Sequence, residues 1–257
     1  MIRDWSNFIA DRTAVVTGSG GGVGRAIAIQ MARAGAELWI NDIHLDRAEK
    51  VCREIEEEGG VATPIVADVC EPEQVARMIK ETGPVDILVN NAGIPAEGIV
   101  VKSFIETGPA DWDPLLRLNL AAVLHVTRAY LPFMVERQWG RILTIVSDAG
   151  RKGERRQAVY GAAKAAAMGF SRGLAAEVGR DGVNVNCIAL GTMRHGQLAD
   201  AIAHDPTIEG RMAKAYPAGR IGEVDDSAPL AVLLCSDAAS WITGQVYPVD
   251  GGYAPAL

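Results

Sequence analysis

Strand-length runs of apolar, often β-branched residues alternate along this chain with segments of helical periodicity. The run at 85–90 (VDILVN) is almost wholly apolar, which is typical of a parallel strand covered on both faces. Repeated strand–helix units predict right-handed crossovers and an α/β fold, a doubly wound parallel sheet of about seven strands with helices on both faces. The predicted strands are 13–17, 37–41, 62–67, 85–90, 141–147, 183–189 and 245–249. The predicted helices are 25–34, 44–58, 72–80, 112–138, 160–179 and 224–235, and we expect Pro132 to bend or break the longest.

The charge balance narrows the classes of partner. The chain has 25 Lys and Arg against 32 Asp and Glu, a net charge of −7, which argues against a general nucleic-acid or anionic-membrane binder and leaves room for a local basic pocket. Residues 1–11 lack the apolar core of a signal peptide, and no apolar run is expected to span a membrane. We therefore expect a cytoplasmic protein that binds neither nucleic acid nor membrane.

The cysteines carry no recognisable metal or disulfide pattern. They show no C-x-x-C pair and no zinc-like spacing, so we expect free thiols in a reducing compartment and no metal site. The four are Cys52, Cys70, Cys187 and Cys235.

The first predicted strand runs into a glycine-rich turn and then a helix. The turn fits T-G-x-x-x-G-x-G with Gly18, Gly22 and Gly24, while Val23 occupies the third glycine position of the common G-x-G-x-x-G fingerprint. Glycines let the backbone approach a pyrophosphate, and the free N–H groups of a helix start bind anions. This context predicts a dinucleotide cradle, with a plain structural turn as the alternative.

The second strand is followed by Asp42, 24 residues after Gly18. A carboxylate at this place accepts hydrogen bonds from the adenosine ribose and repels a 2′-phosphate, so it favours NAD over NADP. Asp42 also precedes the next helix and could serve as its N-cap, and the two roles are compatible. The nearest basic residue downstream, Arg47, lies inside that helix.

A tyrosine and a lysine stand four residues apart on one predicted helix, at Tyr160 and Lys164. A free tyrosine has a pKa near ~10, and a neighbouring cation stabilises its phenolate. Ser147 ends a strand 13 residues earlier, at the edge where doubly wound sheets bind ligands. The pattern indicates an acid/base centre, although Tyr-x-x-x-Lys alone also arises on exposed helices.

The order of these motifs resembles the short-chain dehydrogenase/reductase family over nearly the whole chain, close to its 3-oxoacyl reductase branch. The resemblance implies a Rossmann-type fold in one domain over 1–257, with a dinucleotide-binding half at about 11–95 and a catalytic half at about 96–257. Besides the glycine turn and Asp42, the matching pieces are Asp68 in ADV, NNAG at 90–93, Asn119 in LNLAAV, Ser147, Tyr160, Lys164, VNCIALG at 185–191 and ITGQVYPVDGG at 242–252.

The resemblance also implies roles in catalysis. Tyr160 would exchange the proton with the substrate oxygen, and Ser147 would hold that oxygen. Lys164 would bind the nicotinamide ribose and lower the pKa of Tyr160. Asn119 would kink its helix and complete a proton relay through water to Lys164. A plain helix-kinking residue is the alternative for Asn119.

Further residues are implied at the cofactor. Asp68 and Val69 would hold the adenine, with a loop cap as the alternative for Asp68. Asn90 would stabilise the central strand, and Asn91, Ala92, Gly93, Gly191 and Thr192 would line the site.

Two places depart from the family pattern. The pair after the sixth strand is Leu190-Gly191 where the family usually has Pro-Gly, and His195 stands where it usually has a threonine that contacts the nicotinamide amide. Thr192 could take over that contact, and His195 could titrate near neutral pH or face solvent. The next segment is polar with helical periodicity and would form a lid at about 192–216, with Met193, Leu198, Ile202 and Met212 as its apolar contacts.

Four cations crowd the loop between Ser147 and Tyr160. They indicate an anionic substrate such as an acyl thioester, although a solvated loop or a salt bridge between subunits is the simpler explanation. Asp148 would add a pocket carboxylate or pair with this cluster. The cations are Arg151, Lys152, Arg155 and Arg156.

The function that the sequence predicts is NAD-dependent interconversion of a secondary alcohol and a ketone, in a homotetramer acting on a small hydroxy or keto compound. An NADPH-dependent 3-oxoacyl thioester reductase is the alternative enzyme. A non-catalytic dinucleotide sensor is the alternative from another class, although all four catalytic groups are present. A DNA-binding role is disfavoured by the acidic balance.

Overall fold

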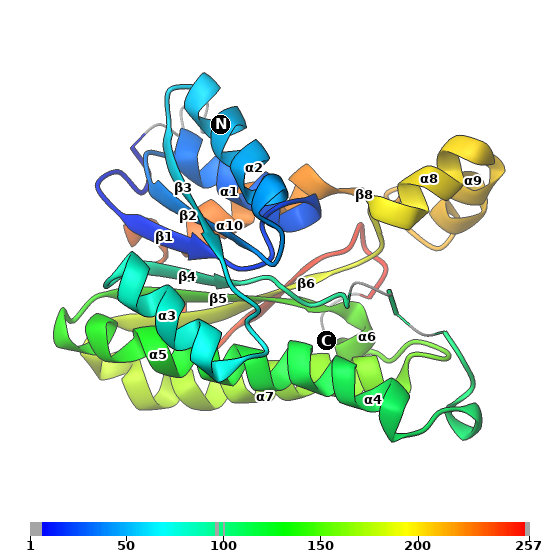
Figure 1. The fold of residues 1–257 in the computed structure, drawn as a ribbon. Helices are drawn as coiled ribbons and strands as arrows, with labels where there is room; N and C mark the ends of the chain where they lie inside the picture. The colour runs from blue at the N-terminus through cyan, green and yellow to red at the C-terminus, as the bar shows by residue number, and fades with distance from the viewer. Residues whose placement is uncertain (1–6, 96–97, 100, 255–257) are drawn as a thin grey trace.

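In the computed structural model, which describes residues 7–95, 98–99 and 101–254, one seven-stranded parallel sheet organises the chain (Figure 1). Every predicted strand is present in it, with each end within two residues of the expectation, and the expected doubly wound α/β fold is confirmed. In spatial order the strands are β3 (Val61–Val66), β2 (Glu37–Asp42), β1 (Thr13–Val16), β4 (Ile87–Asn90), β5 (Gly140–Ser147), β6 (Val183–Leu190) and β9 (Val246–Val249).

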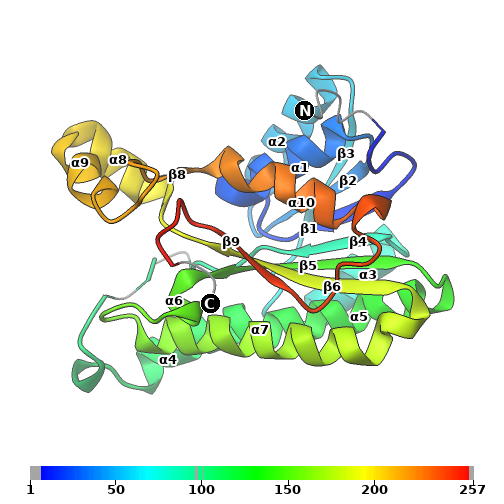
Figure 2. The ribbon, with the colours of Figure 1, turned by 180° about the vertical axis from the view of Figure 1, so that it is seen from behind.

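Two helical layers cover the sheet, as Figures 1 and 2 show from opposite sides. On one face α1 (Gly22–Arg33), α2 (Leu45–Glu57) and α10 (Ala228–Leu234) pack into a core that includes Ile27 and Val232. On the other face α3 (Pro72–Thr82), α5 (Ala122–Glu136) and α7 (Ala158–Val178) pack around a second core. Because both faces are covered, β4 and β6 are buried at every residue, which is why their sequences show no polar alternation.

The strand order reverses next to β1, which pairs with β2 on one side and β4 on the other. The chain winds one way to β3 and then the other way to β9. Ligands of doubly wound sheets bind at the carboxyl ends of the strands beside such a reversal. The glycine turn after β1 and the NNAG segment after β4 both lie there.

The long helix expected at 112–138 is interrupted, but not at Pro132, so the expectation of a break at that residue is wrong. The chain forms α4 (Pro109–Leu116), a π-helical turn at Arg117–Ala121 and then α5, which continues through Pro132. The interruption centres on Asn119, whose side-chain Nδ2 donates to the Leu115 carbonyl at 3.0 Å. A side chain inserted into the backbone ladder is a recognised cause of helix distortion.

This helical stretch also corrects the expectation about membrane-length segments. Among the described residues, Pro109–Glu136 is long and apolar enough to cross a membrane by length and composition alone. A core helix passes the same test, and α5 buries Val126, Tyr130 and Met134 against the sheet and its neighbours. The length of the stretch is therefore weak support for a membrane span.

The expected lid is an outlying pair of helices, α8 (Gly196–His204) and α9 (Thr207–Ala213), which extends away from the sheet in Figures 1 and 2. The short strands β7 (Met193–Arg194) and β8 (Gly222–Glu223) pair at its base. Leu198, Ile202 and Met212 pack with Tyr216 and Ile221 in a small cluster of their own. Met193 instead joins the main core.

Candidate active site

The glycine turn is shaped by close backbone contacts. Gly18 and Gly22 have positive φ angles of 61° and 54°, which non-glycine residues rarely adopt. Asn91 clamps the turn from β4, because its Nδ2 donates to the carbonyls of Thr17 at 2.9 Å and Gly18 at 3.0 Å. A Cβ on Gly24 would lie 2.4 Å from that Nδ2. The turn therefore requires glycine for its geometry.

The residues of this turn fit the diphosphate of a dinucleotide. Helix α1 begins at Gly22 with Gly21 as its N-cap; no side chain caps the first turn and no acidic residue lies in it, so its N–H groups remain available for an anion. Apart from Gly21 itself and its chain neighbours, no atom of the described residues lies within 4 Å of the place where a Cβ of Gly21 would be. Val23 is buried and anchors α1 to the core.

Asp42 ends β2 directly against the turn. Its Oδ2 accepts a hydrogen bond from the Gly20 N–H at 3.2 Å and its Oδ1 accepts one from the His44 N–H at 3.0 Å. The N-cap of α2 is His44, so the interpretation of Asp42 as the helix cap is wrong. A Cβ on Gly20 would approach both the Asp42 carboxylate and the Cβ of Arg47, at 2.5 and 2.7 Å, so the turn requires glycine at this position as well.

The segment after β3 gives a mixed result for its two candidate residues. Asp68 Oδ1 accepts a hydrogen bond from the Cys70 N–H at 2.8 Å, which is the loop-capping contact considered for it. The Val69 side chain is buried in the core below α3. Contact with an adenine ring remains a prediction for both.

Ser147 and Tyr160 meet at the carboxyl end of β5. Ser147 is the last residue of β5, and its Oγ accepts a hydrogen bond from the Ala149 N–H at 3.2 Å as the N-cap of α6 (Asp148–Arg151). Tyr160 lies in the first turn of α7, is 8% exposed and lies near enough to the Ser147 side chain for that hydroxyl to influence its pKa. The two hydroxyls that the sequence assigned to the substrate oxygen are thus neighbours.

Lys164, Asn119 and Gly93 converge beside this pair. Lys164 is 5% exposed, and its Nζ donates to the Ile145 carbonyl at 2.9 Å. A Cβ on Gly93 would lie 2.5 Å from that Nζ and 2.9 Å from Asn119 Oδ1. The Oδ1 atom is buried and has no hydrogen-bond partner within the described part of the chain. The π-helical turn therefore places an unpaired acceptor, Asn119 Oδ1, near Lys164 Nζ.

The electrostatics of the pair differ from the sequence expectation. Burial raises the pKa of Tyr160, and the nearby Ser147 hydroxyl opposes the rise only in part. Lys164 Nζ lies 5.8 Å from the centre of the tyrosine ring, and burial lowers the pKa of Lys164 itself to about 8. The protein groups alone therefore do not produce the lowered tyrosine pKa that the resemblance implies.

The segment after β6 keeps strand geometry in spite of its unusual sequence. Leu190 pairs in register with Ser147 on one side and Val249 on the other, so β6 extends one residue beyond the prediction. A Cβ on Gly191 would lie 3.1 Å from the Asp250 Cα and 3.2 Å from the Tyr216 ring, which explains the need for glycine there.

Tyr216 is a residue that the sequence analysis did not single out. Its hydroxyl accepts a hydrogen bond from the Thr192 N–H at 3.0 Å, and its ring stacks on Tyr253 at 4.8 Å between centroids. These contacts join the end of the lid to the exit of β6 and to the C-terminal segment. A lone tyrosine in a polar stretch carries no pattern that could have identified it.

The fold neutralises part of the basic cluster. Arg151 pairs with Asp148 at 2.7 Å and with Asp250 at 3.4 Å, so Asp148 pairs with the cluster instead of adding a pocket carboxylate. Lys152 lies 3.2 Å from the centre of the Tyr253 ring. Arg155 and Arg156 are exposed and have no ion-pair partner among the described residues. Only Arg156 of these four lines the pocket beside Tyr160.

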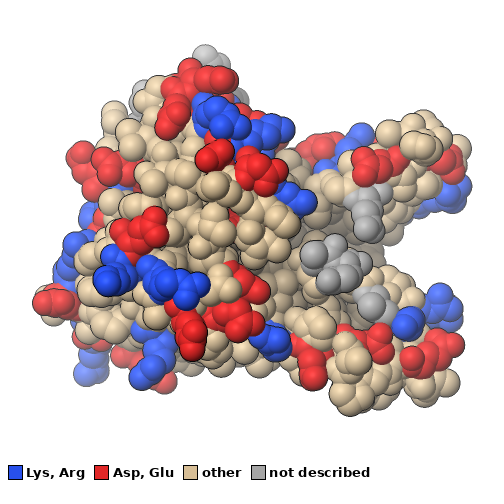
Figure 3. Space-filling model, in the orientation of Figure 1, with Lys and Arg blue, Asp and Glu red and all other residues tan. Residues whose placement is uncertain are grey.

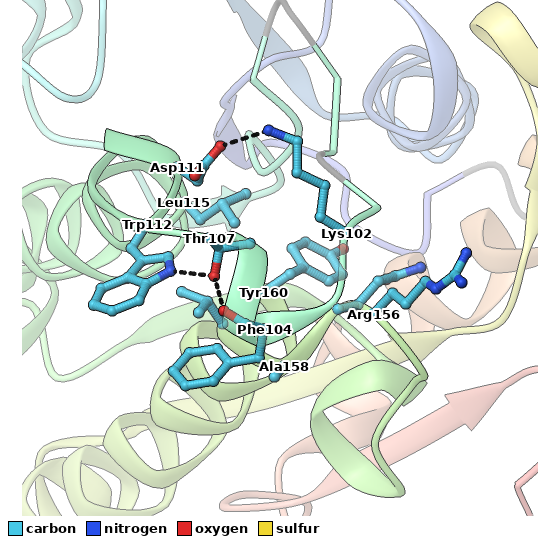
Figure 4. Close-up of a pocket in the computed structure, with 11 residues that line it drawn as sticks. Lys102, Phe104, Thr107, Asp111, Trp112, Leu115, Arg156, Ala158 and Tyr160 are labelled. Atoms are coloured by element: carbon cyan, nitrogen blue, oxygen red, sulfur yellow. Dashed lines mark hydrogen bonds and ion pairs between the residues drawn. The ribbon is translucent and has the colours of Figure 1, made fainter. Parts of the chain in front are cut away.

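That pocket, shown in Figure 4, has a cavity volume of about 20 Å³ and is partly open to solvent. Phe104 and Trp112 stack at 5.5 Å on one side of Tyr160, and Figure 4 draws Arg156 extending on the other side. At the rim Lys102 pairs with Asp111 at 3.4 Å. Phe104 and Lys102 come from a segment without periodicity, so the sequence alone did not identify them.

The pocket belongs to a larger hollow on the molecular surface. Figure 3 shows a notch between the α8–α9 pair above and the η1 (Phe104–Glu106) and α4 region below, with charges of both signs around it. The carboxyl ends of the central strands lead toward this side in Figure 1.

Comparisons with known proteins extend over nearly the whole chain. Residues 18–254 match the family model described as enoyl-(acyl carrier protein) reductase. The "(2S)-[(R)-hydroxy(phenyl)methyl]succinyl-CoA dehydrogenase subunit BbsD" of Thauera aromatica is 36% identical over 248 residues, which cover 95% of this chain and 97% of that protein.

Two solved structures share the fold at similar identity. A gluconate 5-dehydrogenase from Burkholderia cenocepacia, in complex with NADP and tartrate, superposes with a TM-score of 0.89 at 35% identity, covering 98% of this chain and 99% of that one. A 3-oxoacyl-[acyl-carrier protein] reductase with bound NAD from Brucella melitensis has a TM-score of 0.89 at 32% identity, covering 98% and 95%.

Proposed function

The chain belongs to the short-chain dehydrogenase/reductase family of oxidoreductases that act on alcohol and ketone groups, and we propose that it uses NAD(H) to interconvert a secondary alcohol and a ketone. One observation carries the proposal. The Ser147–Tyr160 hydroxyl pair and Lys164 lie together at the carboxyl end of β5, beside the glycine turn.

Each group has a role in proton and charge handling. Tyr160 gives its proton to the carbonyl oxygen during reduction and takes the proton from the alcohol during oxidation. Ser147 holds the same oxygen, because its hydroxyl lies beside that of Tyr160 at the carboxyl end of β5. Lys164 binds the nicotinamide ribose, and Asn119 Oδ1 offers an acceptor beside Nζ for a proton relay. The cofactor, when bound, supplies the hydride chemistry and a positive nicotinamide ring in its oxidised form.

The raised pKa of Tyr160 suggests that the oxidised cofactor would also help to ionise this residue. Burial holds the phenol neutral in the protein alone. A positive charge brought beside the hydroxyl favours the phenolate, so the oxidised cofactor would assist Tyr160 as the base toward the alcohol, whereas the neutral phenol is the form that donates the proton in reduction. This assistance fits a site in which cofactor binds before alcohol.

The choice of NAD rests on Asp42. Its carboxylate lies at the turn where the adenosine ribose would be held, and it would repel a 2′-phosphate. Asp68, Val69, Ala92, Gly191 and Thr192 are proposed to complete the cofactor site. The Burkholderia relative binds NADP and the Brucella relative binds NAD, so turnover with NADH and NADPH must be compared directly. A strong preference for NADPH would favour the 3-oxoacyl reductase alternative.

The substrate is proposed to be a small hydroxy or keto compound that carries an anionic group. Arg156 lines the pocket beside Tyr160 and has no carboxylate partner in the described part of the chain. The relatives named for succinyl-CoA and gluconate substrates act on acids, which supports the same class.

The assembly and location are proposed from composition and exposed surface. We propose one catalytic domain in a cytoplasmic homotetramer, with α8–α9 as its lid. Leu116 on α4 and Leu124 on α5 are more than a third exposed, and Trp241 is 98% exposed, which leaves apolar surface for subunit contacts. Light scattering with size-exclusion chromatography tests the tetramer.

The central experiment follows NADH absorbance with a panel of hydroxy acids, keto acids, hydroxyacyl thioesters and neutral alcohols. Turnover by the wild type and its near-complete loss in Tyr160→Phe, with NADH affinity kept, is the expected result. Substantial activity in Tyr160→Phe would reject the proton role. NADH binding without turnover of any compound would favour the dinucleotide sensor.

A further inference from the structure

The ring of His195 lies beside the glycine turn, close to the position that a side chain on Gly22 would occupy. His195 is the N-cap of α8, the first helix of the lid, and its backbone follows β7. A Cβ built on Gly22 would lie 3.6 Å from His195 Nδ1 and 3.8 Å from its Cγ, and no other described atom lies within 4 Å of that point. The lid therefore places this ring beside the first residue of α1, with a gap between them.

The imidazole has no partner of its own in the protein. It is half-buried, and no side-chain hydrogen bond or ion pair joins it to any residue that the structure describes. Burial lowers the pKa of His195, so the ring is neutral near pH 7 and keeps one N–H donor and one acceptor. A half-buried donor without a partner, set beside the free N–H groups of a helix start, is suited to an anion held between them.

We infer that His195 is a ligand of the dinucleotide's diphosphate and that it couples the lid to the bound cofactor. The inference rests on the proposed function, because it needs a dinucleotide on the glycine turn. The diphosphate would take hydrogen bonds from the α1 N–H groups on one side and from the lid imidazole on the other.

The position of the ring decides between two parts of the cofactor. A residue at this place in the chain could instead contact the nicotinamide amide, as the family threonine does. The neighbour of the His195 ring is Gly22 at the start of α1, whereas the proposed nicotinamide end lies with Tyr160 and Lys164. Of these two possible contacts of His195, the one with the diphosphate would be made by both NADH and ADP-ribose. The one with the nicotinamide amide would be made by NADH alone, because ADP-ribose lacks the nicotinamide.

The test compares equilibrium binding of NADH and ADP-ribose to the wild type and His195→Ala by titration calorimetry. We expect both affinities to fall by the same factor, about 10- to 100-fold for one lost hydrogen bond to a charged group. His195→Asn keeps a side-chain N–H donor and should recover most of the affinity. His204→Ala, at the exposed far end of the same helix, is the matched control and should bind both ligands like the wild type.

The outcomes separate the inference from the proposed function. A loss of NADH affinity with ADP-ribose unaffected would assign His195 to the nicotinamide and overturn the inference. Unchanged binding of both ligands would overturn it as well, as would an equal loss in His204→Ala. A wild type that binds neither NADH, NADPH nor ADP-ribose would defeat the proposed function itself.

Discussion

Replacing Lys164 with methionine should abolish turnover and, at pH 7, make the protein more stable. The lysine is 5% exposed, and the structure gives its Nζ one hydrogen bond, to the Ile145 carbonyl. No carboxylate among the described residues pairs with it. The fold therefore carries a poorly compensated buried cation at the centre of its active site, and methionine fills a similar volume without a charge.

The magnitude follows from the pKa. Burial lowers the pKa of Lys164 from an ordinary value of 10.5 to about 8. At ~1.4 kcal/mol for each pKa unit, this difference corresponds to about 3 kcal/mol of destabilisation by the charged form. Loss of the hydrogen bond to the Ile145 carbonyl offsets about 1 kcal/mol of the gain. We expect Lys164→Met to raise the free energy of unfolding by about 2 kcal/mol at pH 7.

The sign of the pH dependence follows from proton binding. Because the folded pKa is the lower one, the unfolded wild type binds more protons than the folded protein between pH 8 and 10.5. Stability of the wild type therefore rises through this window, while Lys164→Met lacks this contribution. The advantage of the variant should shrink by about 3 kcal/mol between pH 7 and 10.5 and end near or below zero.

Urea unfolding at both pH values and at one protein concentration measures the difference. Lys80→Met on α3 is the control for exchanging an exposed lysine, and its difference from the wild type should not follow this pH trend. A Lys164→Met variant that is less stable than the wild type at pH 7, or whose advantage is the same at both pH values, would refute the reasoning.

Three further predictions concern the cofactor and the substrate. Gly93→Ala puts a Cβ 2.5 Å from Lys164 Nζ and should lower kcat about 100-fold by displacing the ammonium, as steady-state kinetics would show. Asp42→Ala removes the repulsion of a 2′-phosphate and should raise the ratio of kcat/KM for NADPH over NADH at least about tenfold; an unchanged ratio would contradict the role of Asp42. Arg156→Gln should raise KM for a carboxylate substrate about tenfold and leave KM for its methyl ester unchanged, while Arg155→Gln, outside the pocket, alters neither. Equal effects of the two arginine variants would remove Arg156 from substrate recognition.

Local sequence pattern was enough to predict the features that depend on residues close together in the chain. Apolar runs such as 85–90 predicted buried parallel strands because both faces of such strands are covered. The glycine turn was predicted because positive φ angles and close backbone contacts leave few other residues that fit. Tyr160 and Lys164 were paired in advance because four residues along a helix return to the same face.

Contacts between distant segments decided the rest. The resemblance already implied a kink at Asn119, but only the fold brings Lys164 and Asn119 together beside Gly93. Arg151, which the sequence presents as part of an unpaired basic cluster, forms an ion pair with Asp250, 99 residues further along the chain.

The same holds for chemistry that depends on burial. The sequence places a cation near Tyr160, but the pKa of that phenol is set by how much water the fold excludes from it, and exclusion raises it. In the sequence His195 is an isolated polar residue, and only the folded lid places its ring beside Gly22. The order of motifs along the chain determined which groups this site contains. The charge that each group carries and the atoms that it contacts depend on distance and desolvation, which are properties of the whole packed molecule.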